Sequence, residues 1–199
     1  MNIHTTAIVL IGFQKDYFSE NGVLHDVIEN SAASVLANTV KLLELLQSTE
    51  VTFISTPIYF TRDYSELVNP VGILKVIQDA GAFRKDTEGS ETIAELSRYG
   101  DRILTVEGKR GLNAFHSTHL ENVLLTRGIT DVVLAGVVTS ICIDSTARSA
   151  FERGFKVHVL ADCTAGRTEY EHAFYCSEVF PLYSHVINSQ ELLEHFAVA

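Results

Sequence analysis

Short, mostly apolar runs alternate along the chain with segments in which apolar positions recur every three or four residues. Runs of five or six apolar residues are typical of strands buried on both faces, and the wider spacing is typical of helices. The runs predict six strands, at 6–11, 51–55, 102–106, 131–136, 156–160 and 183–187. Because strands and helices alternate, we expect an α/β fold with three αβα layers: a Rossmann-like parallel sheet of about six strands with helices on both faces.

Polar residues mark the expected ends of helices between these strands. Asn30 or Ser31 can cap the first helix, because their side chains accept hydrogen bonds from free backbone N–H groups. Its apolar positions recur at helical spacing: Val35, Leu36, Val40, Leu43 and Leu46. Two further helices are expected at 143–151 and 189–196.

The stretch 58–91 departs from this alternation. Pro70 and three glycines interrupt it, and its apolar residues gather at 71–77. We expect an irregular insertion with one short helix, placed near the active site, within a single domain that spans residues 1–199.

Composition and charge narrow the possible functions. The net charge of −10 and the absence of any Lys/Arg run longer than two argue against a nucleic-acid partner. No apolar run approaches the ~20 residues needed to span a bilayer, so no membrane partner is expected. The chain opens without a basic and then apolar leader, which favours a cytoplasmic location.

The cysteines and histidines do not predict a disulfide framework or a metal site. There are three cysteines, an odd number without paired spacing, and Cys163 and Cys176 are interpreted as structural. His116 and His119 are the closest histidine pair, but nothing nearby completes a ligand set. No glycine-rich nucleotide motif follows a strand, so we expect neither a metal nor a cofactor.

Three segments are expected to meet where the parallel strands end, since ligands bind beyond the carboxyl ends of such sheets. They are residues 12–16, Lys109 and Cys142. Cys142 lies between a predicted strand and a predicted helix, and a helix N-terminus favours a thiolate and a developing oxyanion. The alternative is a small buried cysteine that only fills space at a tight turn.

Motifs in these segments resemble those of a known family. They lie at 8–18 (IVLIGFQKDYF), at 109–115 with Thr118 and Leu120, and at 136–142 (GVVTSIC), continuing to 154. In order and spacing, over about residues 7–186, they resemble the isochorismatase-like cysteine hydrolases, the family of nicotinamidases and N-carbamoylsarcosine amidases. The resemblance implies a hydrolase that attacks a small amide, carbamoyl or related C–N substrate through a Cys142 thioester.

The resemblance also assigns roles to residues. Lys109 would lower the thiol pKa, and the backbone N–H groups of Val138 and Cys142 would form the oxyanion hole. The Val137–Val138 peptide would be cis, and Phe115 and Phe13 are candidates to bind the substrate. Family members assemble as dimers, tetramers and larger rings, so we expect a homo-oligomer acting on a small molecule.

One position departs from the family pattern. The catalytic aspartate of the Cys–Asp–Lys triad falls at Gly12, and Gln14 and Asp16 fix that register. Four interpretations follow. Lys109 serves Cys142 directly; Asp16, Asp63 or Glu66 supplies a carboxylate; the protein is a catalytically impaired member with a binding or assembly role; or Gly12 is an introduced change in an active enzyme.

Two reactions of the family are disfavoured. The resemblance implies that isochorismate hydrolysis relies on the aspartate rather than the cysteine, and Gly12 replaces that aspartate. A metal-dependent nicotinamidase is also disfavoured, because residues 57–63 lack the histidine of those enzymes. If the site is otherwise intact, Gly12→Asp is expected to raise turnover of a suitable amide at least about tenfold.

Overall fold

The computed structural model describes residues 1–197 and contains one six-stranded parallel sheet with the strand order β3-β2-β1-β4-β5-β6. The strands are β1 (Thr6–Ile11), β2 (Thr52–Thr56), β3 (Ile103–Thr105), β4 (Asp131–Val137), β5 (Lys156–Ala165) and β6 (His185–Ile187). The predicted α/β class and the six predicted strands are confirmed. β1 and β4 are buried along their whole length, which explains their unbroken apolar runs.

The fifth strand is longer than its apolar run indicates. It was expected to end at residue 160 but continues to Ala165, and its register with β4 shifts between Leu134 and Gly136. Asp162 therefore lies inside β5 rather than after it. Its carboxylate accepts hydrogen bonds from the backbone and hydroxyl of Ser189 and so holds the start of the last helix.

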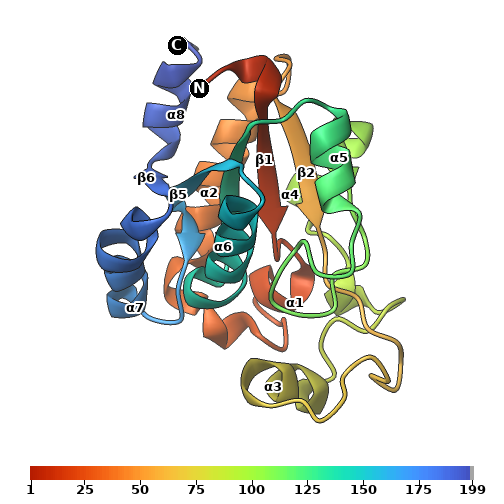
Figure 1. Ribbon diagram of the computed structural model, residues 1–199. Coiled ribbons are helices and arrows are strands. Elements are labelled where there is room, and N and C mark those ends of the chain that lie inside the picture. Colours follow the sequence, from red (N-terminus) through yellow and green to blue (C-terminus); the bar gives the residue numbers. More distant parts are fainter. Residues whose placement is uncertain (198–199) are drawn as a thin grey trace.

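Helices cover both faces of the sheet (Figure 1). The α-helices within residues 1–197 are α1 (Lys15–Phe18), α2 (Glu29–Leu46), α3 (Gly72–Ala80), α4 (Ala94–Ser97), α5 (Leu120–Thr126), α6 (Asp144–Glu152), α7 (Glu169–Phe174) and α8 (Ser189–His195). Alternate residues of β1 enter different cores. Ile8 and Leu10 pack in the cluster that contains α2 and α8, whereas Val9 and Ile11 pack in the cluster that contains α5 and α6.

The expected helix ends are partly corrected. α2 begins at Glu29 after Ile28, without a side-chain cap, so Asn30 and Ser31 lie inside the first turn instead of capping it. The N-terminus of α8 does have a side-chain cap, because Asn188 and Glu191 form a reciprocal capping box. None of the helices within residues 1–197 is long and apolar enough to cross a membrane.

The insertion is fastened to the end of β1 by two buried side chains. Gln14 donates to the carbonyls of Ile58 (2.9 Å) and Ser90 (2.7 Å) and accepts from the Ile58 N–H (2.8 Å). The Asp16 carboxylate accepts from the Phe83 N–H at 2.7 Å. These bonds join both ends of the segment to the body, and α3 lies beyond the carboxyl ends of the strands (Figure 1).

Candidate active site

Two glycines let the ends of β1 and β4 approach each other closely. Gly136 pairs with Ile11, and a Cβ on Gly136 would lie 1.8 Å from the Ile11 carbonyl oxygen. Gly12, the residue after Ile11, has a φ of +77°. Side chains are excluded at the first position and strained at the second, so this corner of the sheet requires glycine for backbone reasons.

Cys142 lies in a single π-helical turn, Thr139–Ile143, between β4 and α6. The Val138 carbonyl accepts hydrogen bonds from the N–H groups of Ile141 (3.0 Å) and Ile143 (3.2 Å), which fixes the turn. The Val137–Val138 peptide before it is cis, as the resemblance implies. The side chain of Cys142 is buried at the carboxyl end of the central strand, where the sequence analysis expected it.

Lys109 reaches Cys142 from the loop between β3 and α5. Its side chain is fully buried, and its Nζ lies 3.5 Å from the Cys142 Sγ. The Nζ also donates to the Gly111 carbonyl at 2.6 Å. Burial lowers the pKa of Lys109 despite the opposing influence of the neighbouring Cys142 side chain. Two of the three segments expected to meet therefore do so in direct side-chain contact.

The third segment brings no carboxylate to this pair. A Cβ on Gly12 would lie 2.9 Å from both the Cγ2 and the carbonyl oxygen of Val137, and 3.6 Å from a ring carbon of Tyr17. The room for a larger side chain is thus taken by Val137 and Tyr17. Within residues 1–197, no ion pair joins Lys109 to a carboxylate.

The three acidic residues considered as substitutes are committed elsewhere. Asp16 binds the Phe83 N–H, and burial raises the pKa of its carboxyl group. Asp63 binds Thr61 on the surface, and Glu66 binds Thr61 and Arg110. The interpretation in which one of them replaces the aspartate has no geometric support.

Neither aromatic residue predicted to bind substrate contacts the cavity described below. Phe13 is buried and stacks on Phe18 with ring centroids 4.9 Å apart. Phe115 packs against Phe155, and the Arg153 guanidinium lies 4.8 Å from its ring centroid. Their apolar surfaces serve the core in this structure.

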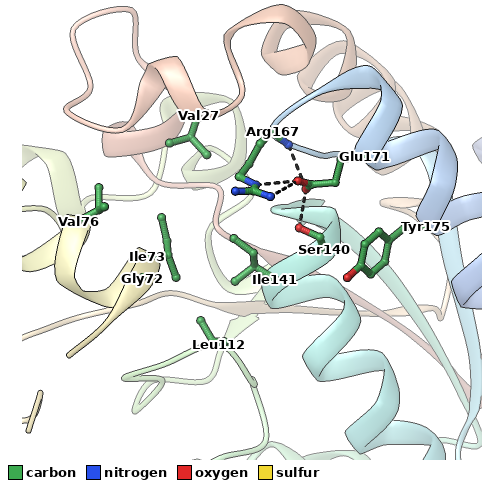
Figure 2. Close-up of a pocket in the computed structure, with 10 residues that line it drawn as sticks. All are labelled: Val27, Gly72, Ile73, Val76, Leu112, Ser140, Ile141, Arg167, Glu171 and Tyr175. Atoms are coloured by element: carbon green, nitrogen blue, oxygen red, sulfur yellow. Dashed lines mark hydrogen bonds and ion pairs between the residues drawn. The ribbon is translucent and has the colours of Figure 1, made fainter. Parts of the chain in front are cut away.

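A cavity of about 710 Å³ opens beside the π-helical turn Thr139–Ile143, which is called the π-turn below (Figure 2). Its wall includes Leu112, from the loop that carries Lys109, and Ser140 and Ile141, from the π-turn that carries Cys142. Both segments that bring Lys109 and Cys142 together therefore contribute to the cavity. The other lining residues are Val27, Gly72, Ile73, Val76, Arg167, Glu171 and Tyr175. Helix α3 therefore forms one wall, and most of the lining is apolar.

Two consecutive residues of the π-turn are hydrogen-bonded to two consecutive residues of α7. The Ser140 hydroxyl donates to the Glu171 carboxylate at 2.5 Å, and the Thr139 hydroxyl lies 2.9 Å from the His172 Nδ1. Glu171 is also paired with Arg167. The sequence analysis missed this network. The position of Arg167 just after β5 was an available signal, but it was hidden while that strand was thought to end at residue 160.

Known proteins share this fold and contain the same domain. The Isochorismatase domain model matches residues 6–191. Nicotinamidase 3 of Arabidopsis thaliana is 28% identical over 141 residues, which cover 71% of this chain and 69% of that protein.

Two solved structures are similar over nearly their whole length. A cysteine hydrolase from Pseudomonas syringae pv. phaseolicola 1448A gives a TM-score of 0.86 at 20% identity, covering 98% of this chain and 93% of the other. N-carbamoylsarcosine amidase from Thermoplasma acidophilum gives 0.73 at 24% identity, covering 92% and 96%. With the domain matched over residues 6–191 and the same α/β fold, this chain belongs to the isochorismatase family of hydrolases.

Proposed function

We propose that this protein is a cysteine hydrolase that cleaves a small amide, carbamoyl or related C–N substrate through a thioester on Cys142. The observation that carries the proposal is the buried contact of 3.5 Å between the Lys109 Nζ and the Cys142 Sγ, beside a cavity of small-molecule size. The relative named nicotinamidase supports an amide as the substrate class.

In the proposed mechanism Lys109 takes the role of the base. Burial favours the neutral form of the Lys109 amine, and in that form the amine accepts the thiol proton. The Cys142 thiolate then attacks the carbonyl carbon, and the N–H groups of Val138 and Cys142 hold the developing oxyanion. Lys109 returns the proton to the leaving nitrogen, which departs as ammonia or an amine. Water then cleaves the thioester, releasing the carboxylic acid or carbamate product and restoring the thiol.

A second candidate is a catalytically impaired member that keeps the fold for binding or assembly. The glycine in place of the family aspartate favours it, since a lost general base typically costs about 10²–10⁴-fold in rate. No carboxylate within residues 1–197 is hydrogen-bonded to Cys142 or paired with Lys109, which adds weight to this candidate, while the contact between Lys109 and Cys142 argues for the enzyme.

The first test is the pH dependence of iodoacetamide alkylation, read for each cysteine by peptide mass. The other cysteines are internal controls, because burial raises the pKa of the Cys176 thiol to about 11 and that of Cys163 further. We expect Cys142 to be alkylated faster at neutral pH than either of these cysteines, because its proton can pass to the neighbouring Lys109. A Cys142 as slow as Cys176 would favour the binding role. Amide turnover that disappears in Cys142→Ala but persists in Cys176→Ala would complete the assignment.

We also propose that the protein acts in the cytoplasm as a homo-oligomer. Val68, Val71 and Leu182 are among the most exposed apolar side chains of the described residues. Association with another copy would cover such surface. Sedimentation velocity would test the assembly, and a monomer at micromolar concentration would oppose it.

A further inference from the structure

The charged end of the cavity has a particular composition. Among its lining residues only Arg167 and Glu171 carry formal charges, and they are paired with each other (Figure 2). The Glu171 Oε2 lies 2.6 Å from the Arg167 Nη2 and 2.7 Å from the Nε. The remaining walls come from aliphatic residues, a glycine, a serine and a tyrosine.

The two partners differ in how firmly they are held. The Glu171 side chain is 12% exposed, whereas that of Arg167 is 60% exposed. Glu171 is fixed from two directions, by the Ser140 hydroxyl and by Arg167. Burial alone would raise the pKa of Glu171, but these hydrogen bonds outweigh it and lower the pKa below the ordinary value, so the carboxylate is ionised at neutral pH.

A partly buried, ionised carboxylate that already occupies the arginine decides which ligands fit. An anionic ligand would have to share Arg167 with Glu171 and bring two negative charges close together, which is unfavourable. A cationic ligand would be repelled by the Arg167 guanidinium. An uncharged ligand avoids both kinds of repulsion, and the aliphatic walls stabilise its apolar part.

We propose that Glu171 is a specificity-determining residue that cancels the charge of Arg167, so that the site accepts uncharged, aliphatic amides and rejects amides that carry a carboxylate. This inference rests on the proposed function, because it identifies the substrate class of the same cavity. It assigns Glu171 a role beyond holding the π-turn. The conservative variant Glu171→Gln separates the two roles, because its amide oxygen still accepts from Ser140 while the negative charge is gone.

The test compares two ligands of similar shape, 4-methylpentanamide and succinamate, in which an isopropyl group replaces a carboxylate. We expect the wild-type kcat/KM to favour 4-methylpentanamide by at least about tenfold. In Glu171→Gln, Arg167 is free to bind the carboxylate, and the preference should shift toward succinamate by at least about tenfold. Arg167→Gln provides the opposite change, because it leaves Glu171 unpaired and should make rejection of succinamate stronger.

A second readout separates this inference from the proposed chemistry. Each ligand is tested for its ability to slow iodoacetamide alkylation of Cys142, which reports binding without turnover. If neither amide is hydrolysed but protection follows the expected preferences in the three proteins, the proposed reaction fails and the inference holds. If folded Glu171→Gln, checked by thermal unfolding, discriminates between the ligands as the wild type does, the inference is overturned. Equal acceptance of both ligands by the wild type overturns it as well.

Discussion

The ends of β1 and β4 lie side by side in the sheet, yet they differ in what they retain of the family's catalytic pattern. After β4, the π-turn carries Cys142 to within 3.5 Å of Lys109. After β1, Gly12 stands where the resemblance places an aspartate, at a φ of +77° and against Val137. The end of β4 brings a thiol and an amine into contact, while the end of β1 is a place of close backbone packing. The contact between Lys109 and Cys142 therefore does not need a carboxylate at position 12.

The largest effect is expected from removing the lysine. Lys109→Met keeps most of the buried volume but removes the amine, so we expect amide turnover to fall about 10²–10⁴-fold and Cys142 alkylation at neutral pH to slow with it. Steady-state rates and alkylation rates would be measured together. Lys75→Met is the matched control, since Lys75 is exposed and pairs with Asp79 on α3. Unchanged alkylation in Lys109→Met would mean that the contact is structural and that the two strand ends are equally inactive.

Restoring the aspartate tests the other strand end. The structure reverses the expectation drawn from sequence alone, because Gly12→Asp would put a Cβ 2.9 Å from Val137 in a left-handed backbone conformation. We expect it to lower the free energy of unfolding by about 1–3 kcal/mol and to give no tenfold gain in turnover. Urea unfolding and amide kinetics would measure both quantities.

Two alanine variants divide that cost into parts. Gly12→Ala has the same Cβ contact without the carboxylate, so its difference from Gly12→Asp isolates the effect of the carboxylate group. Gly154→Ala also has a positive φ, of +84°, but meets nothing within 4 Å, so it reports backbone strain alone. A stable and faster Gly12→Asp would contradict the packing argument and support the interpretation of Gly12 as an introduced change in an active enzyme.

Features of this fold that depend on neighbouring residues in the sequence were easier to predict than contacts between distant segments. Apolar runs located all six strands, and they are clearest at β1 and β4, because burial on both faces leaves a local mark in the sequence. The end of β5 was wrong by five residues, because the shifted register against β4 admits polar residues such as Asp162. Lys109 and Cys142 were predicted to meet because parallel strands end at one edge, a property of topology rather than of local sequence.

The hydrogen bonds between the π-turn and α7 were not predicted. The partners Ser140 and Glu171 are 31 positions apart and fall on a turn and a helix whose relative placement no local pattern records. Phe115 illustrates a different difficulty. An aromatic residue near a catalytic loop suits a substrate pocket and a core equally well by composition, and in the structure it packs against Phe155.

The smallest expected effect concerns the second bond between the π-turn and α7. Thr139→Val replaces the hydroxyl that faces His172 Nδ1 with a methyl group in a fully buried position, leaving the imidazole nitrogen without this partner. We expect a loss of about 1 kcal/mol in unfolding free energy and a moderate slowing of Cys142 alkylation, since Ser140 and Glu171 still hold the turn. Thr139→Ser keeps the hydroxyl and is the matched control, so it should retain the alkylation rate of the wild type. If Thr139→Val loses stability while alkylation stays at the wild-type rate, α7 supports the fold of the β4 end without positioning its nucleophile.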